Sequence, residues 1–294
     1  MIQTPAHPKS VAGVGMGYDI GILDLEGIRT AVDWARLGGW NPGLRDAEAF
    51  AAPDPQGFLG LKLDGELVAT ISLVDYGPGF GFLGFYICRP DHRGKGLGMV
   101  LWNEALRRTA ARTIGLDGVK AQQPNYRKSG FVLAHENIRH GGLRPTGYAQ
   151  GDAALTVLSA ADAAAIDRFE QAHRLFPAPR PKFLADWLRY DALALRRDGE
   201  IAGYGVIRQC HEGWKVGPLF AANVADAETI LRGLLTKMPD GTFFLDTPGT
   251  NQAAVDLALS LGLKPMFETA RMYRGPAPEI DTAKVFGITT FELG

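Results

Sequence analysis

The 294-residue sequence contains only two cysteines and almost no net charge, and it lacks the segments that define several protein classes. Cys88 and Cys210 are too few for a disulfide framework and lie in apolar, strand-like runs, so we expect buried free thiols in a reducing cytoplasm. No run of about 18 apolar residues is present to span a membrane. The N-terminus lacks the pattern of a secretion signal, and we expect a loose tail over the first dozen residues. A net charge of −1 without a basic block argues against a nucleic-acid partner.

Two common glycine motifs for phosphate binding are also missing. The run Gly-x-x-x-x-Gly-Lys-Ser/Thr does not occur, and Met99 breaks the Gly-x-Gly-x-x-Gly spacing that begins at Gly94. The earlier run from Gly13 to Gly17 fails by one residue in the same way, and we interpret it as a flexible lead-in segment. No His/Cys/Asp/Glu cluster has metal-ligand spacing, so we predict no metal.

A glycine-rich stretch from Arg93 to Gly98, Arg-Gly-Lys-Gly-Leu-Gly, is the most informative feature that is present. It lies between the apolar run Phe80–Cys88 and a helical pattern over residues 97–111, which predicts strand, tight turn and helix. Alternate glycines let several N–H groups converge at the first turn of that helix, where the dipole favours an anion. Arg93 and Lys95 add positive charge, so the expected guest is a phosphate or pyrophosphate.

Arg93, Gly96 and Gly98 occupy the fixed positions of a pattern, Gln/Arg-x-x-Gly-x-Gly/Ala. The stretch therefore resembles the acetyl-CoA pyrophosphate loop of the GCN5-related N-acetyltransferases (GNAT), in which the wording of Arg89–Gly96 is also common. A second segment, Tyr126–Phe131, is similar to the Tyr-x-Lys-x-Gly-Phe of the same family, on a short helix before a strand.

The elements expected in the first half follow the order of that family: helix, helix, three antiparallel strands, helix, strand, short helix, strand. An amphipathic helix over Ile28–Trp40 ends at Gly38-Gly39, and a second short helix runs through Phe50. Leu59–Leu63 and Leu67–Val74 flank an Asp-Gly turn and predict a hairpin. The apolar face of the first helix is expected to carry Ile28, Ala31, Val32, Ala35 and Leu37.

In the family the first two helices usually roof the acceptor site. Three aromatic residues there either line a pocket or belong to the core: Trp34, Trp40 and Phe50. Three carboxylates there either hold an ammonium group or lie on solvated helix faces: Asp33, Asp46 and Glu48.

Length and internal similarity both predict two domains. An apolar content of 46% and a charged content of 21% are typical of a soluble globular protein, and 294 residues suffice for two ordinary cores. Leu193–Ile201 repeats Leu59–Leu67 at an offset of 134 residues, and Leu259–Leu263 repeats Arg127–Phe131 at an offset of 132. We place the linker in the weakly periodic stretch after Phe131.

We thus expect an α/β protein with two tandem GNAT-like domains, residues 1–148 and 152–294. Each should contain a mixed, mostly antiparallel central sheet flanked by helices. Val224–Glu228 stands where the glycine loop would be, and Ala258 stands opposite Tyr126, so the second domain has lost the expected acetyl-CoA site. It resembles the degenerate C-terminal domain of bacterial tandem members. It has two candidate roles, closing the acceptor site or forming a homodimer interface.

The resemblance implies acetyl-CoA as co-substrate and a set of residues that bind it. Tyr126 matches the tyrosine that protonates or hydrogen-bonds the leaving thiolate, and the competing interpretation is a core aromatic residue that caps a helix. The cofactor-binding residues would be Tyr86, Ile87, Cys88, Arg93, Gly94, Lys95, Gly96, Leu97, Gly98, Asn125, Tyr126 and Lys128.

The general base is not identified by the sequence. Some family members carry a glutamate on the strand before the loop, but Phe80–Cys88 contains no carboxylate. Asp75, His135 and Glu136 are candidates, and a water chain is the alternative. We interpret the other histidines, including His92 and His173, as structural or solvated.

Three hypotheses for function follow. The first is an acetyl-CoA-dependent N-acyltransferase acting on a small-molecule amine in the cytoplasm. The second is a non-catalytic acyl-CoA-binding sensor. The third is an enzyme that acetylates protein lysines or N-termini. The acyl group is expected to be acetyl, with a longer chain left open.

Overall fold

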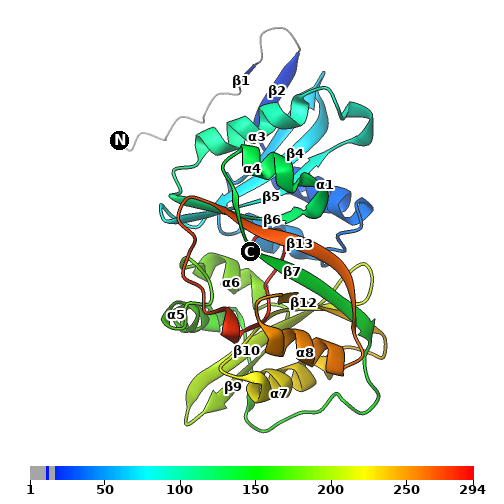
Figure 1. The fold of residues 1–294 in the computed structure, drawn as a ribbon, viewed down its shortest axis with the longest axis vertical. Coiled ribbons are helices and arrows are strands. Elements are labelled where there is room, and N and C mark those ends of the chain that lie inside the picture. Colours follow the sequence, from blue (N-terminus) through cyan, green and yellow to red (C-terminus); the bar gives the residue numbers. More distant parts are fainter. Residues whose placement is uncertain (1–10, 13–16) are drawn as a thin grey trace.

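The computed structural model describes residues 11–12 and 17–294. Residues 1–10 of the expected tail and most of the Gly13–Gly17 run lie outside the described residues, whereas Val11–Ala12 form a short strand. The described strands form one mixed 14-stranded sheet that runs the length of the molecule (Figure 1). Its order is β1-β2-β3-β4-β5-β6-β13-β7-β12-β11-β10-β9-β8, and β14 pairs with β11. The mixed α/β fold class is confirmed.

The N-terminal half, up to residue 143, contains seven of the described strands and four helices. Its strands are β1 (Val11–Ala12), β2 (Tyr18–Ile22), β3 (Phe58–Leu63), β4 (Glu66–Asp75), β5 (Phe80–Cys88), β6 (Thr113–Val119) and β7 (Val132–Leu143). Its helices are α1 (Leu25–Leu37), α2 (Asp46–Ala51), α3 (Leu97–Arg108) and α4 (Gln123–Lys128).

The C-terminal half repeats this order of elements from residue 155 onward. Its strands are β8 (Leu155–Val157), β9 (Asp191–Arg197), β10 (Glu200–Gln209), β11 (Trp214–Ala221), β12 (Thr242–Pro248), β13 (Lys264–Arg274) and β14 (Val285–Gly287). Its helices are α5 (Ala163–Ala172), α6 (Pro181–Trp187), α7 (Val224–Leu235) and α8 (Gln252–Ser260).

The first helix and its surroundings differ from the expectation in two respects. Asp24 caps α1 by accepting a hydrogen bond from the Gly27 N–H at 2.9 Å, so the helix begins earlier than predicted. Leu37 is 68% exposed, so its placement on the apolar face was wrong, whereas the other four predicted residues are buried. The strand β2, which precedes α1 and pairs with β3, was not predicted.

Matching hairpins confirm the internal repeat. In the β3–β4 hairpin Asp64 and Gly65 have φ angles of 51° and 86°, and in the β9–β10 hairpin Asp198 and Gly199 have 50° and 84°. Two successive positive φ angles are typical of a type I′ turn, whose twist suits a tight hairpin. The two helices that follow the next strand of each half, α3 and α7, also occupy corresponding places.

Two long strands cross between the halves. β7 leaves the N-terminal half and pairs with β12, while β13 inserts between β6 and β7 (Figure 1). The strand expected after Phe131 is β7, and it continues through Gly141-Gly142 to Leu143, so the weakly periodic stretch assigned to the linker begins as a strand. The domain boundary at residues 148–152 remains a prediction, and the sheet itself is continuous across it.

Equivalent buried ion pairs join the exchanged strands to their hosts. Arg271 of β13 donates two hydrogen bonds to Asp117 of β6, at 2.8 and 2.7 Å. Arg139 of β7 donates two to Asp246 of β12, both at 2.8 Å. In each pair the two residues stand directly opposite in the strand register. Each half therefore contributes the arginine that neutralises the aspartate of the other half.

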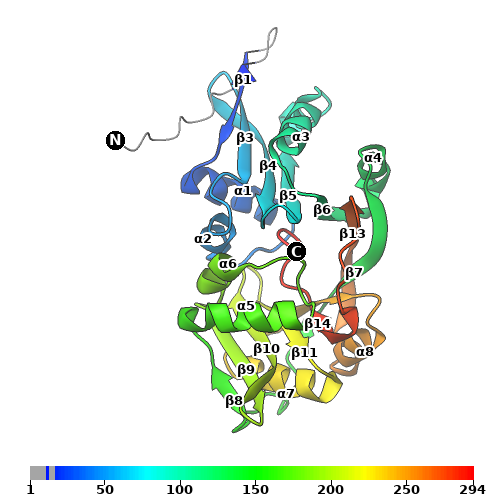
Figure 2. The same ribbon diagram turned by 90° about the vertical axis from the view of Figure 1, so that its left-hand side faces the viewer.

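Helices cover both faces of the N-terminal part of the sheet (Figure 2). Ile28 and Ala31 of α1 pack in a core cluster with Phe58 and Phe80. Leu97 and Leu101 of α3 pack in a separate cluster on the opposite face. These two layers fix β5 and the start of α3, between which the candidate site lies.

Candidate active site

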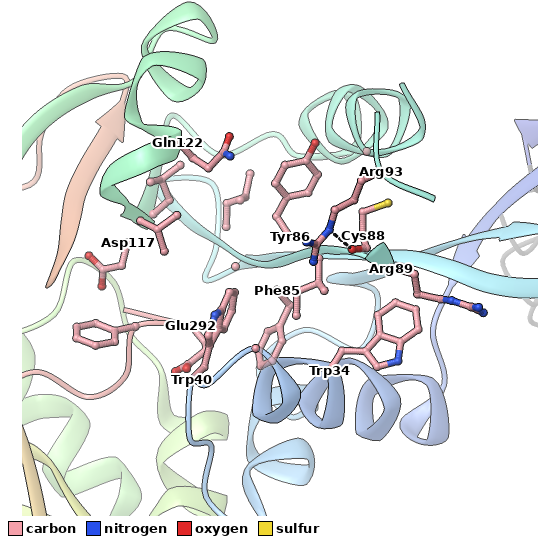
Figure 3. A pocket seen from close by; sticks show the side chains of 18 of the residues that line it. Trp34, Trp40, Phe85, Tyr86, Cys88, Arg89, Arg93, Asp117, Gln122 and Glu292 are labelled. Atoms are coloured by element: carbon pink, nitrogen blue, oxygen red, sulfur yellow. Dashed lines mark hydrogen bonds between the residues drawn. The ribbon is translucent and has the colours of Figure 1, made fainter. Parts of the chain in front are cut away.

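The central strands β5 and β6 part from each other halfway along their length. Phe80–Leu83 of β5 pairs in parallel with Thr113–Leu116 of β6, and the pairing stops there. Beyond that point a cavity of about 960 Å³ opens between the strands (Figure 3). A cavity of this size is at the upper end of the range for small-molecule sites.

A bulge in β5 shapes the cavity wall. Phe85 has a φ of 46°, and the register between β4 and β5 shifts between Thr70 and Ser72. The Thr70 hydroxyl donates to the Phe85 carbonyl at 3.0 Å and holds this conformation. Because Gly84–Cys88 pairs with β4 on one side only, its other edge faces the cavity with unpaired backbone groups.

The glycine loop forms one end of the cavity. Gly94 and Gly96 have φ angles of 75° and 80°, a region that favours glycine, and Gly96 is the N-cap of α3. No side chain caps this helix, so its first N–H groups remain available to a ligand. A Cβ atom on Gly98 would lie 2.7 Å from the Tyr86 hydroxyl, which explains why glycine is needed there. The arrangement is suited to an anion.

Cationic side chains surround this loop. Arg93 donates through Nε to the Cys88 carbonyl at 3.0 Å, which fixes its stem along the end of β5. Arg89 is held by Glu66 and Asp91. Both arginines line the cavity, so this end of it carries positively charged side chains. His92 also lines the cavity and therefore lies at the candidate site, beyond the structural or solvated role expected from the sequence.

Tyr126 lies across the gap from β5. Its ring stacks on Trp102 with centroids 5.6 Å apart and lies against Gly118, where a side chain would overlap it. Burial raises the pKa of Tyr126 to about 12, so the phenol is neutral at physiological pH. It is thus a hydrogen-bond donor in the cavity wall.

Nine of the twelve predicted cofactor-binding residues line this one cavity. They are Tyr86, Ile87, Cys88, Arg93, Gly94, Gly96, Leu97, Gly98 and Tyr126. Lys95, Asn125 and Lys128 lie outside the lining, and the Asn125 side chain donates to Gln122 at 2.8 Å. Gln122 itself, which was not predicted, does line the cavity.

The aromatic residues of α1, α2 and the segment between them, together with Asp46, fall into two groups, those that line the cavity and those that are buried elsewhere. Trp34 and Trp40 line the cavity, whereas Phe50 is fully buried and stacks on Trp187. Asp46 is also buried and pairs with Arg208 at 3.2 Å, so its placement on a solvated face was wrong.

None of the three predicted base candidates lines the cavity. Asp75 accepts a hydrogen bond from Thr109 at 2.6 Å, and Glu136 lies 3.7 Å from Lys120. His135 faces a different hollow, and burial, with a smaller contribution from Arg271, lowers its pKa to about 4. The sequence interpretation missed the two carboxylates that do line the cavity, Asp117 and Glu292.

The C-terminal half completes the cavity. Phe267 and Thr269 of β13 and the segment Phe291–Glu292 belong to its wall. A Cβ atom on Gly84 would overlap the Glu292 carbonyl oxygen, so the end of the chain lies directly against β5. Sequence patterns gave no role to Glu292, because this contact joins residues that lie far apart along the chain.

The corresponding place in the C-terminal half is closed. In β11 and β12, Trp214–Val216 pairs in parallel with Phe243–Leu245, and the pairing ends there. Further along β11, Leu219 and Phe220 pair with β14 instead. The Asn223 side chain caps α7 by accepting from the Asp226 N–H at 3.0 Å. A hollow of only about 40 Å³ remains nearby.

Three further observations describe the chemistry on offer. Within residues 17–294, no group of three or more His, Cys, Asp or Glu residues is placed to hold a metal ion. No helix of the described chain is long and apolar enough to cross a membrane. Both cysteines are free thiols, but Cys88 is only partly buried, contrary to expectation, and lines the cavity.

Comparisons with known proteins agree with these features. Residues 25–131 match the model of the Acetyltransferase (GNAT) family, and residues 169–287 match that of an Acetyltransferase (GNAT) domain. The holothin acyltransferase of Pseudoalteromonas sp. (strain SANK 73390) is 32% identical over 275 residues, covering 92% of each chain.

Solved structures share the fold over nearly the whole chain. A provisionally assigned acetyltransferase from Pyrococcus horikoshii has a TM-score of 0.80 at 21% identity, covering 98% of this chain and 99% of its own. A tandem GNAT protein from the clavulanic acid biosynthesis pathway has a TM-score of 0.61 at 13% identity, covering 88% and 99%. The chain is an N-acyltransferase that belongs to the GCN5-related N-acetyltransferase superfamily, with two GNAT domains in tandem.

Proposed function

We propose that this enzyme transfers an acetyl group from acetyl-CoA to the primary amine of a small molecule. The observation that carries the proposal is the meeting of an open splay between β5 and β6 with an uncapped, glycine-rich helix N-terminus. The N–H groups at the start of α3 would hold the diphosphate. The unpaired edge of Gly84–Cys88 would bind the pantetheine arm as an added strand does.

Tyr126 is proposed to stabilise the leaving thiolate. As the amide bond forms and the C–S bond breaks, negative charge develops on sulfur, and a neutral phenol can donate a hydrogen bond to it. Because the pKa of Tyr126 is about 12 and that of a free thiol is about 8.5, complete proton transfer from the phenol is uphill. Tyr126 would therefore assist by hydrogen bonding, and the thiol would receive its proton from the attacking nitrogen.

The shape of the cavity favours a small acceptor over a protein. Phe267, Phe291 and Glu292 of the C-terminal half form part of the cavity wall, so the space beside β5 is bounded by both halves of the chain. A peptide acceptor would need an open groove there. The relative that acts on holothin, at 32% identity over almost the full length, also supports a small-molecule acceptor.

The first test is calorimetric titration of acetyl-CoA into the full-length protein, the Gly96→Asp variant and the Asn223→Asp variant. We expect one site per chain in the wild type. Gly96→Asp should weaken binding at least about 100-fold, because it places a Cβ atom at a φ of 80° and a negative charge beside the diphosphate. Asn223→Asp keeps a side-chain cap on α7 but loses the hydrogen bond that the Asn223 amide donates to Asp226. It should leave acetyl-CoA affinity unchanged, because Asn223 does not line the cavity.

Other outcomes have defined meanings. Two sites per chain would show that the C-terminal half also binds the donor. No binding at millimolar acetyl-CoA would overturn the proposal. Binding without thiol release in the presence of any amine would favour the acyl-CoA sensor.

A further inference from the structure

Glu292 is a buried residue whose carboxylate has no partner among the residues that the structure describes. The residue is 3% exposed and lines the cavity, yet its carboxylate forms no hydrogen bond or ion pair within 4 Å with any described residue. Burial of an unpaired carboxylate costs several kcal/mol in general, so such groups in proteins have a partner or a function. A ligand in the cavity is the natural source of that partner.

Each of the three cations nearest to Glu292 has another described partner, although Nη1 and Nη2 of Arg208 have none among the described residues. Arg139 is bound to Asp246 through both oxygens, and Arg208 lies 3.2 Å from Asp46. Lys215 donates to the Asn41 carbonyl at 2.9 Å. Burial raises the pKa of Glu292, while these three cations oppose that effect and Asp46 adds to it.

The charges divide the cavity into two ends. Arg89 and Arg93 line the end at the glycine loop, where an anion would lie. Glu292, Trp40 and Phe85 also line the cavity. In Figure 3 these three residues lie on the opposite side of the cavity from Gln122. Asp117, the other carboxylate in the wall, is neutralised by the two hydrogen bonds from Arg271. The acceptor end therefore presents one unpaired negative charge between aromatic walls.

We propose that Glu292 is the acceptor subsite, which binds the ammonium group of a small amine with a flat apolar body and takes up its proton. This inference rests on the proposed function. The ammonium nitrogen gives one proton to the Glu292 carboxylate and becomes the nucleophile. It then forms the bond to the acyl carbon as the C–S bond breaks, and its second proton passes to sulfur. Glu292 returns its proton to solvent, so each turnover releases one proton, one amide and one thiol.

The C-terminal half is what places this group. β14 is fixed against β11, and the Ile288 N–H donates to the Asp246 carbonyl at 2.8 Å. The segment after it reaches Gly84, one residue from the bulge at Phe85. The C-terminal half, which has no glycine-rich cofactor loop, thus supplies the carboxylate that strand β5 lacks.

A purely structural role is the main alternative. Two nitrogens of Arg208, Nη1 and Nη2, are buried without a partner among the described residues. In this alternative, Glu292 only balances the charge of Arg208 through bound water. The experiment must distinguish loss of amine recognition from loss of folding.

The test compares wild type, Glu292→Gln, Glu292→Asp and Glu136→Gln in the full-length enzyme. Glu136→Gln is the matched control, because Glu136 is exposed, pairs with Lys120 and does not line the cavity. Acetyl-CoA affinity is measured by calorimetry. Thiol release is measured from pH 6 to 9 with tyramine, tryptamine and 2-phenylethylamine as acceptors, and each variant is also unfolded in urea.

We expect Glu292→Gln to lower kcat/KM for the amines about 100-fold or more, the usual range for loss of a general base, with acetyl-CoA affinity unchanged. Its residual rate should rise with pH, as the fraction of free amine rises. Glu292→Asp should recover part of the activity, and Glu136→Gln all of it.

Equal rates for Glu292→Gln and wild type would overturn the assignment of Glu292 and leave the proposed function intact. A fall in rate that tracks unfolding, with no change in the pH profile, would show the structural role instead. Binding of acetyl-CoA by the wild type without turnover or binding of any of the amines would overturn the acceptor class. Failure of the wild type to bind acetyl-CoA would refute the proposed function itself.

Discussion

The two halves of this protein contain the same splayed pair of parallel strands, but only one pair encloses a cavity. Between β5 and β6 the gap remains open, with about 960 Å³ of space. Between β11 and β12 the chain itself fills the gap, because β14 pairs with β11 where a ligand would otherwise lie. Loss of a site in a duplicated fold can therefore follow from occupation by the polypeptide as well as from loss of ligand-binding residues.

The helix that starts beside each gap shows the same contrast. α3 begins at a left-handed glycine with no side-chain cap, whereas Asn223 caps α7 and Asp226 pairs with Arg197 at 2.8 Å. The N–H groups that are free in one half are thus satisfied within the other. An uncapped helix end normally reduces stability by about 1 kcal/mol, a cost consistent with a binding role at α3.

The largest predicted effect concerns the equivalent ion pairs. Asp246→Ala should lower the free energy of unfolding by about 3–5 kcal/mol, because it leaves the Arg139 guanidinium buried without a carboxylate. Asp117→Ala should do the same to Arg271. Urea unfolding, with the slope compared between variants, measures both.

The matched control is Asp33→Ala, which removes an exposed pair with Arg36 and should change stability by less than about 1 kcal/mol. A small effect of Asp246→Ala beside a large effect of Asp117→Ala would show that the two strand exchanges are not energetically equivalent.

The next prediction compares two tyrosines of similar acidity, one in the cavity wall and one packed against the core of the C-terminal half. Burial raises the pKa of both Tyr126 and Tyr148 to about 12. Only Tyr126 lines the cavity, while Tyr148 packs under Arg232. Tyr126→Phe should lower kcat about 10- to 100-fold with little change in acetyl-CoA affinity, since it removes one hydrogen bond to developing charge. Tyr148→Phe should leave both unchanged, and equal effects of the two would remove Tyr126 from the chemistry.

Local sequence patterns predicted the parts of this fold that depend on local interactions. The glycine loop, the Asp-Gly hairpin and its repeat at Asp198-Gly199 are each specified by a few adjacent residues. The exposure of Leu37 was not predicted, because an amphipathic pattern does not show which residues in the last turn of a helix pack against another element. The strand β2 was missed because it is short and its partner β3 lies 35 or more residues away.

The exchange of β7 and β13, and with it the acceptor end of the site, could not be predicted in this way. Gly141 and Gly142 weaken the alternation of β7, and its partners lie about 100 residues further along the chain. Glu292 reaches the cavity because the last residues of the C-terminal half lie against β5, and the ion partner of Asp117 comes from β13 of that half. A buried carboxylate looks the same in sequence as a solvated one until its partners are known.

The smallest predicted effect concerns the pH dependence of stability and compares His135 of β7 with the equivalent residue of β13, Phe267. His135 stands opposite Arg271 as Phe267 stands opposite Arg139, and the His135 pKa is lowered to about 4. Between pH 6.5 and 4 the unfolded chain binds more protons than the folded one, so His135 makes the protein less stable as pH falls through that window. His135→Phe, which copies the equivalent residue, should recover about 1–2 kcal/mol at pH 5 relative to its effect at pH 7. Urea unfolding of wild type and variant at both pH values measures that difference. An identical effect of the substitution at the two pH values would mean that burial and Arg271 do not lower the pKa of His135.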